Sequence, residues 1–325
     1  MRCFTLLFIL GFIPSQNLLA EEDLFRFGKR KYQSSDLEAK YQLQIFEAEM
    51  QAFQQKERIL EEAILELHFL EQAKKSQKSV ESLQKEALEV NEPTEEELRT
   101  FYQNNRKKIP YPFEQIRSEL VRFVSNQKME SRRAELLEKL KNTGNYKSLL
   151  SMPKMPVLSI PSEKFFKRGK AESKIQLVEF ADYQCPHCSS SAAAMEKAYE
   201  RFGKQVEFVF IDFPVLQGIS RRLAEAAYCA GQQNKYWEYH KLLFENQSTV
   251  KEQSIEEFAK QLNLDKSAFQ ACLDSAAPGK FIDMSKQEGQ RLGVTGTPSV
   301  FINGRRILQR ISLDLLVKEI EAQLK

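Results

Sequence analysis

One helical stripe dominates the first half of the chain. Apolar residues recur from Ala39 to Leu67 in alternating steps of four and three, broken only by Glu57. This spacing puts them on one side of a long helix with a near-heptad repeat. Ser35 and Glu38 have the spacing of a capping box, which predicts Ser35 as the N-cap. The stripe fits a helix packed within its own domain, and it fits a self-associating coiled coil equally well.

The rest of this half is also helical in pattern. Thr94 and Glu97 form a second capping box, and a segment that opens at Pro110 runs with helical spacing to about Lys141. No set of side chains here suggests catalysis. We therefore expect an all-α domain over residues 21–150.

The pattern changes after that domain. Residues 151–170 are rich in proline and predict a linker with a first short strand near 157–160. "IQLVEFADY" reads as a buried strand, "SSSAAAMEKAYERFG" as a helix closed by Gly203, and "QVEFVFIDF" as another strand.

The end of the chain completes an α/β pattern. A helical block covers about 217–277, and a further helix follows it. "PSVFING" and "RRILQR" predict a hairpin across Asn303 and Gly304, and a last helix has Ser312 as its cap. A βαβ opening, a helical insertion and a ββα ending predict a thioredoxin-like fold over residues 171–325.

The first twenty residues, "MRCFTLLFILGFIPSQNLLA", have a short apolar core from Phe4 to Ile13 and a small residue at Ala20. This pattern predicts a signal peptide over residues 1–20. No later run approaches eighteen apolar residues, so we expect an exported protein, periplasmic or otherwise, that is soluble after cleavage.

Composition narrows the classes further. Hydrophobic residues make up 42% and charged residues 29%, which is typical of a soluble globular protein. The net charge of +3 gives no reason to expect a nucleic-acid partner.

Four cysteines remain after the predicted cleavage, and they allow three pairings. Cys185 with Cys188 is the local choice, which leaves Cys229 with Cys272. Two buried free thiols at the second pair are the alternative to a bridge there.

The run Cys-Pro-His-Cys stands where a strand leads into a helix, so Cys185 is expected at the helix N-terminus. Backbone N–H groups and the helix dipole there favour the thiolate. Pro186 suits the first helical turn, and His187 adds a dipole or cation beside the sulfur. Cys188, one turn later, is placed to resolve a mixed disulfide.

Other uses of this pair are less well supported. A zinc or copper site needs further ligands, but the sequence has no second pair of this spacing and only His68 and His240 as other histidines. We therefore expect no metal and no cofactor beyond the redox-active disulfide itself.

Two distant features bear on the pair. Glu179 precedes Cys185 by six residues on the buried strand, where a carboxyl group could exchange protons with the thiols. The alternative is an exposed edge residue. Thr297-Pro298 precedes a strand and suits a cis bond that presents the Thr297 backbone to a substrate chain; a trans turn proline is the alternative.

The motifs "VEFADYQCPHC", "LAEAAYCAGQQNKYWEYHKLLFEN" and "GVTGTPSVFING" resemble the DsbA-like thiol-disulfide oxidoreductases over residues 157–325. The resemblance implies Cys185 as nucleophile, Cys188 as resolving thiol, Glu179 as buried acid and Thr297-Pro298 as the substrate loop. It also implies a second, non-catalytic cysteine pair, and a quinone-linked membrane partner for an oxidase. Threonine before the proline occurs in oxidases and isomerases alike, so the direction of exchange stays open.

Residues 40 to 142 resemble the helical module of SurA-like periplasmic chaperones, through the phrasing "TEEELRTFY" followed by "PFEQIRSEL". This resemblance implies binding of unfolded polypeptides. The sequence thus predicts an exported thiol-disulfide oxidoreductase that acts on cysteine-containing secreted polypeptides. The alternatives are an oligomeric disulfide isomerase and a holdase chaperone with a secondary redox domain.

Overall fold

The computed structural model describes residues 23–106, 108–144 and 146–324. The chain divides into two compact units. The first combines the chain up to Glu47 with everything from Lys154 onward, and the second spans Ala48–Pro153.

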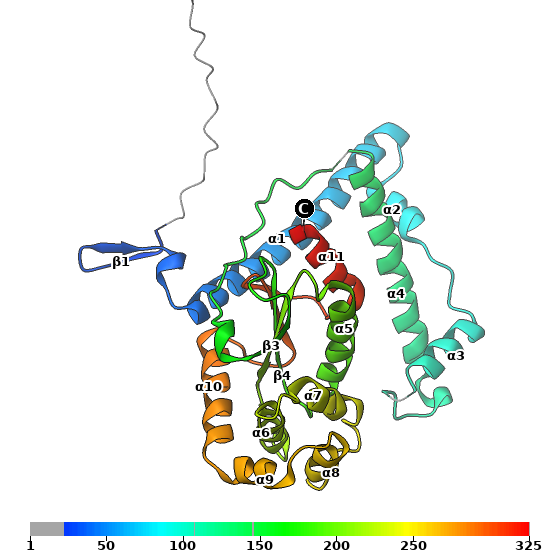
Figure 1. The fold of residues 1–325 in the computed structure, drawn as a ribbon. Helices are drawn as coiled ribbons and strands as arrows, with labels where there is room; N and C mark the ends of the chain where they lie inside the picture. The colour runs from blue at the N-terminus through cyan, green and yellow to red at the C-terminus, as the bar shows by residue number, and fades with distance from the viewer. Residues whose placement is uncertain (1–22, 107, 145, 325) are drawn as a thin grey trace, which may run out of the picture. The chain divides into compact units, whose positions relative to one another are not determined.

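A five-stranded mixed sheet forms the centre of the first unit (Figure 1). Its order is β3-β5-β4-β6-β7. The strands are β3 (Phe166–Gly169), β4 (Gln176–Ala181), β5 (Glu207–Asp212), β6 (Ser299–Ile302) and β7 (Arg305–Ile307). β4 and β5 are parallel and the other pairs are antiparallel. β4 is therefore a central strand, and its residues from Leu177 onward are all buried.

Helices cover both faces of this sheet. α5 (Pro186–Phe202) and α11 (Leu313–Leu324) pack on one face, where Ala198 and Ile320 join a common core with Leu177. The other face packs against the start of α1 (Ala39–Ser76) and the end of α10 (Ala277–Arg291), through residues such as Leu43 and Leu292. The first turns of the long helix thus belong to the core of the sheet unit.

The predicted helical insertion lies between β5 and α10. It consists of α6 (Ser220–Gly231), α7 (Tyr236–Glu245), α8 (Ser254–Gln261) and α9 (Lys266–Asp274). Its apolar side chains form one core with the β4–α5 junction, which includes Tyr183, Cys185 and Cys188. The insertion therefore encloses the junction from one side.

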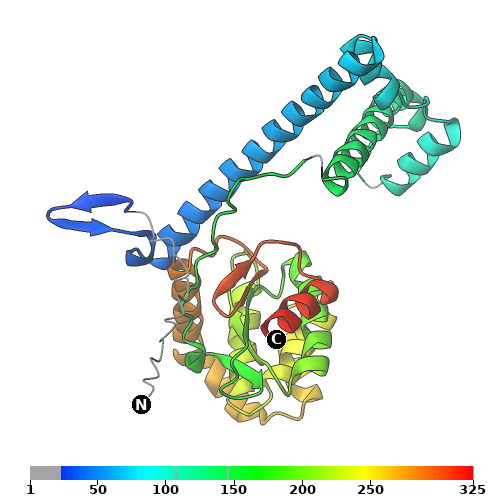
Figure 2. The same cartoon turned by 90° about the horizontal axis from the view of Figure 1, so that it is seen from above.

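The second unit is helical. After the remainder of α1 come α2 (Val80–Leu88), α3 (Glu95–Asn104) and α4 (Phe113–Asn142), which Figure 2 shows from a second side. The capping box at Thr94 and Glu97 is present, with the Glu97 amide donating to the Thr94 hydroxyl and the Thr94 amide to the Glu97 carboxylate. The predicted all-helical character of this region is confirmed between residues 39 and 142.

Three local predictions were wrong. Ser35 is not the N-cap of the long helix, because a 3-10 turn, η1 (Ser34–Asp36), intervenes and α1 begins at Ala39. A hairpin of β1 (Phe25–Phe27) and β2 (Arg30–Tyr32) precedes it, where we expected only helices. Its strands have three residues each and are mostly exposed, so the alternation of Phe25, Arg26 and Phe27 is too short to indicate a strand.

The expected first strand near 157–160 is also absent from the described structure. These residues are extended, and Leu158 and Ile160 pack into the core below the sheet. The Leu158 amide donates to the Gly304 carbonyl at 2.9 Å, but the strand that joins the sheet edge is β3. Their apolar character reflects burial rather than strand pairing.

The predicted hairpin at the C-terminal end is confirmed. β6 and β7 pair across Asn303 and Gly304, which have φ values of 46° and 74°. Asparagine and glycine are the residues that tolerate this left-handed backbone. The predicted signal peptide lies outside the described residues, and none of the helices within them is long and apolar enough to cross a membrane.

Candidate active site at the start of α5

The turn between β4 and α5 is held by one aspartate. Asp182 accepts the Gln184 amide at 2.8 Å and the amides of Val215 and Leu216 at 2.9 Å each. Its carbonyl accepts the Cys185 amide at 3.0 Å. These bonds fix the backbone that presents the cysteine pair.

Cys185 is the N-cap of α5, and Pro186 occupies the first turn. Cys185 is 8% exposed and stands at the N-terminal end of a 17-residue helix. Unpaired backbone N–H groups and the helix dipole favour an anion at such a position. His187 follows on the exposed side of the first turn.

The cis-proline loop lies directly against this sulfur. The Thr297-Pro298 peptide bond is cis. The Cys185 thiol donates to the Thr297 carbonyl at an Sγ–O distance of 3.3 Å. Residues 112 positions apart in the chain thus form one surface.

Cys188 and Glu179 lie behind that surface. Cys188 is fully buried and Glu179 is 1% exposed. The Ser191 hydroxyl donates to Oε1 of Glu179 at 2.6 Å. Glu179 therefore lies buried on β4, as expected, and not on an exposed edge.

Burial sets the protonation of both groups. It raises the pKa of Glu179 to about 7, against smaller opposing effects of the Ser191 hydrogen bond and the positive charge of Arg168. Burial also raises the pKa of the Cys188 thiol, and the nearby Glu179 carboxylate adds to this effect. A carboxyl group that titrates near neutrality next to a buried thiol can accept and return a proton.

An amide from the insertion supports the reactive loop. Nε2 of Gln247 donates to the carbonyls of Tyr183 at 2.9 Å and Cys185 at 2.8 Å. Gln247 lies beyond the end of α7, so the insertion contributes directly to the position of Cys185.

A cavity of about 450 Å³ opens beside the cis-proline loop. It is bordered by Ser190 and Ser191 of α5, by Thr297 and Pro298, and by the chain that follows β7. His187 also lines it, so one wall of the cavity adjoins the reactive turn.

A second set of buried polar side chains lies where the insertion packs against β5. Tyr236 donates to Oδ2 of Asp212 at 2.9 Å, and the Tyr183 hydroxyl lies 3.1 Å from Nδ1 of His240. Burial raises the pKa of Asp212 to about 7 and lowers the pKa of His240 to about 3. His240 is therefore a neutral core residue.

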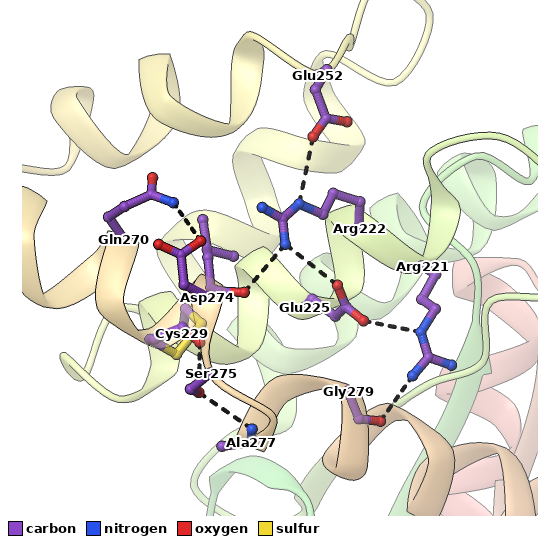
Figure 3. Close-up of polar contacts among 12 residues, drawn as sticks. Arg221, Arg222, Glu225, Cys229, Glu252, Gln270, Asp274, Ser275, Ala277 and Gly279 are labelled. Atoms are coloured by element: carbon purple, nitrogen blue, oxygen red, sulfur yellow. Dashed lines mark hydrogen bonds and ion pairs between the residues drawn. A yellow bond between two sulfur atoms is a disulfide. The ribbon is translucent and has the colours of Figure 1, made fainter.

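The remaining two cysteines form a disulfide. Cys229 of α6 is bonded to Cys272 of α9, with their Cα atoms 5.7 Å apart. In the same region, Arg222 forms two ion pairs (Figure 3). Its Nη1 lies 3.6 Å from Oε2 of Glu225, and its Nε lies 3.5 Å from Oε1 of Glu252. Cys185 and Cys188 are thiols. Among the described residues, no group of three or more potential ligands could hold a metal ion.

Sequence reasoning missed three contributors to this region. Ser191 lies three residues after Cys188, a spacing that puts both on one helix face and could have indicated it. Glu47, which also lines the cavity, lies four residues after the buried Leu43, which is a similar but weaker signal. For Gln247, far along the chain in a loop, the sequence offers no local signal.

Comparison with known proteins agrees with this architecture. A family model described as Thioredoxin matches residues 162–322. Among curated proteins, the chain is 30% identical over 141 residues to a Na(+)/H(+) antiporter NhaA 3 from Salinispora tropica. It is 27% identical over 142 residues to a Na(+)/H(+) antiporter NhaA from Herminiimonas arsenicoxydans. In both, the match covers 43% of this chain and only 22% of the antiporter.

Solved structures to which part of the chain is similar include the thiol-disulfide exchange protein alpha-DsbA2 from Wolbachia pipientis, at 23% identity and a TM-score of 0.46. That match covers 49% of this chain and 87% of the other. BdbD from Bacillus subtilis has 22% identity and a TM-score of 0.47, covering 52% and 97% respectively. The family match and the strand order together show that the C-terminal half of this chain is a thioredoxin-like domain.

Proposed function

We propose that the domain is a thiol-disulfide oxidoreductase that acts on exported, cysteine-containing polypeptides. One observation carries the proposal. The Cys185 sulfur lies at a helix N-terminus, 3.3 Å from the Thr297 carbonyl, with Cys188 and Glu179 buried behind it. A reactive sulfur, a resolving thiol and a proton acceptor are the groups that disulfide exchange needs.

In the reducing direction, the Cys185 thiolate attacks one sulfur of a client disulfide. The client S–S bond breaks, a mixed disulfide forms, and the other client sulfur leaves as a thiolate that takes up a proton. Cys188 then loses its proton to Glu179 and attacks the Cys185 sulfur. This step releases the second client thiolate and leaves Cys185 and Cys188 joined, so two electrons have passed to the client.

The oxidising direction reverses these steps. A client thiolate attacks Cys185 in the Cys185–Cys188 disulfide, and Cys188 leaves as a thiolate. A protonated Glu179 can neutralise that buried thiolate, which burial otherwise disfavours. A second client thiolate then displaces Cys185, and the client keeps the new disulfide.

Which direction prevails depends on partners. As an oxidase, the domain needs a partner that reoxidises the Cys185–Cys188 pair, for which we propose a quinone-linked membrane protein. As an isomerase, it acts in the dithiol form, and self-association would help it hold misfolded clients. Either role fits an exported protein, because disulfides persist in oxidising compartments.

The helical unit favours a second role, that of gripping clients. A pocket of about 370 Å³ between α3 and α4 is lined mainly by apolar side chains, including Phe101, Ile116 and Phe123. Phe123 is 56% exposed. Apolar surface of this kind suits binding of unfolded segments, and we propose it as a holdase function alongside the redox domain.

A trapping experiment tests the redox proposal. The Cys188→Ser variant, mixed with a peptide that contains a disulfide, should form a covalent adduct at Cys185 that dithiothreitol releases. Peptide mapping by mass spectrometry locates the adduct. Cys185→Ser should form none and should lose insulin reduction. Full insulin reduction by Cys185→Ser would overturn the proposal and leave the client-binding role as the main function.

A further inference from the structure

The cavity beside the cis-proline loop carries charge, and its charges come from distant parts of the chain. Besides His187 and Pro298, its lining includes Glu47 of α1, Arg306 of β7 and Arg310 in the segment that follows. All of these residues belong to the sheet unit. The N-terminal segment therefore contributes a side chain to the wall next to the proposed reactive cysteine.

Arg306 is held in a defined position. Its guanidinium pairs with Oε1 of Glu47 at 3.0 Å and donates to the Ser299 hydroxyl at 3.2 Å. The Arg306 side chain is 17% exposed, whereas that of Glu47 is 49% exposed. A guanidinium has five N–H donors, so two contacts leave it able to bind a further acceptor.

Arg310 adds a second positive charge. It is exposed at the edge of the cavity, and within the described part of the chain no ion pair involves it. The lining thus has two guanidinium groups and one carboxylate, and it also includes His187. A concave site with this balance attracts negative charge.

A client caught at Cys185 is held beside this cavity, because Thr297 and His187 both adjoin Cys185 and line the cavity wall. Thr297 accepts the Cys185 thiol and also lines the cavity, so the client residues on either side of the attacked cysteine lie within reach of it. One residue of an extended chain advances about 3.3 Å. A side chain one to three positions from the client cysteine can therefore enter the space.

We propose that this cavity is a client subsite that prefers an acidic side chain close to the reactive cysteine. Arg306 and Arg310 bind the carboxylate, and arginine suits carboxylates because it can donate two parallel hydrogen bonds. This inference rests on the proposed exchange reaction and adds the class of client to it.

Glu47 has the opposite effect in this arrangement. Its carboxylate occupies Arg306 in the free protein, so an acidic client side chain must compete with it. Removal of the Glu47 charge should strengthen binding of acidic clients, while removal of either arginine should weaken it. Substitution of Glu47 and substitution of either arginine should therefore change the binding of acidic clients in opposite directions.

The test uses three peptides that differ at one position, two residues from a single cysteine, which carries glutamate, glutamine or lysine. Each cysteine is activated as a mixed disulfide with thionitrobenzoate, and release of that dye reports attack by Cys185 in the full-length Cys188→Ser variant. Each rate is divided by the rate of the same peptide with dithiothreitol, which removes the intrinsic effect of the peptide's charge.

At low salt we expect the glutamate peptide to react about twofold to fivefold faster than the lysine peptide, a range typical of partly exposed charge pairs. Added salt should narrow the difference. Arg306→Gln and Arg310→Gln should each reduce it, Arg306→Lys should retain part of it, and Glu47→Gln should enlarge it. Arg305→Gln is the matched control, because Arg305 is the exposed neighbour on β7 and does not line the cavity.

Two different results would overturn the inference, and each rejects a different part of it. Equal normalised rates for all three peptides would reject the acidic subsite while leaving the exchange reaction intact. Absence of dye release with every peptide would reject the exchange reaction itself. Circular dichroism of each variant shows that a lost preference does not come from a lost fold.

Discussion

The Ser191 hydroxyl donates a hydrogen bond of 2.6 Å to Oε1 of Glu179. Both residues are 1% exposed, yet Ser191 borders the cavity beside the cis-proline loop. This bond joins a buried carboxyl group to a residue at the edge of open space. Ser191 therefore connects Glu179 to the wall of the cavity through one hydrogen bond.

Removing this hydroxyl should raise the pKa of Glu179 above about 7. The bond from Ser191 favours the carboxylate, and in Ser191→Ala only burial and more distant charges remain. The carboxyl carbon of Glu179, followed by NMR as pH is varied, measures the shift. Ser190→Ala is the matched control, because Ser190 lines the same cavity but is exposed. A Glu179 pKa that falls or stays unchanged in Ser191→Ala would contradict this account.

Replacing the acid itself should change how stability depends on pH. The folded state holds the Glu179 proton up to about pH 7, whereas the unfolded chain releases it near the ordinary value of 4.5. The free energy of unfolding therefore falls as pH rises between these values and is lower by about 3 kcal/mol above them. Glu179→Gln cannot ionise and should lack this decline.

Urea denaturation at pH 5 and pH 8 measures the effect. Glu179→Gln should be more stable than the wild type at pH 8, and the gain should shrink toward pH 5. Other groups titrate in the same range, so the difference between the two proteins at each pH is the relevant quantity. An equal difference at both pH values would show that Glu179 is already ionised throughout the range.

The sequence predicted the parts of this site that adjoin one another in the chain. Cys185 at a helix start, Cys188 one turn later and Glu179 on the preceding strand follow from a strand that runs into a helix. Local spacing carries this information, because the strand and helix periods place each side chain relative to its neighbours.

Contacts between distant segments could not be predicted in the same way. Glu47 and Arg306 are 259 positions apart, and each looks like an ordinary solvated charge in its own segment. Their pairing depends on how α1 packs on the sheet, which a single stripe of apolar residues does not specify. The hairpin at Phe25–Tyr32 was not predicted from the sequence for another reason. Its strands are short, exposed and rich in basic residues.

The buried carboxyl group of Asp212 should depend strongly on the Tyr236 hydroxyl, the side chain whose hydrogen bond lowers its pKa most. Tyr236 donates to its Oδ2 at 2.9 Å, and within the described structure its Oδ1 has no hydrogen-bond partner. In Tyr236→Phe, the carboxylate loses this bond, at a cost of about 1–3 kcal/mol. Because burial raises the Asp212 pKa to about 7, the cost should be larger at pH 8 than at pH 5, where the group is protonated.

A second tyrosine provides the comparison. Tyr239 is also buried, and its hydroxyl donates to the Ile255 carbonyl at 3.0 Å, a contact without an ionisable partner. Tyr239→Phe should therefore destabilise the domain by a similar amount at both pH values. If Tyr236→Phe also proves independent of pH, Asp212 does not titrate in this range.

The Cys229–Cys272 bridge should stabilise the insertion without taking part in exchange. The bridge spans 43 positions, so in the chain-entropy model its loss costs about 3–4 kcal/mol. The Cys229→Ala/Cys272→Ala variant should unfold at lower urea concentration than the wild type. When both proteins also carry Cys188→Ser, so that the redox pair cannot contribute, dithiothreitol should lower the midpoint of the bridged protein toward that of the variant and leave the variant itself unchanged.

Disulfide exchange can be measured in the same bridge-free variant. Cys185 lies at the start of α5, whereas the bridge joins α6 to α9, so adduct formation at Cys185 should persist at temperatures where the variant is folded. Gln247 ties the reactive loop to the insertion through the Tyr183 and Cys185 carbonyls. If adduct formation fails while the variant is still folded, the bridge also controls the geometry of the reactive turn through this amide.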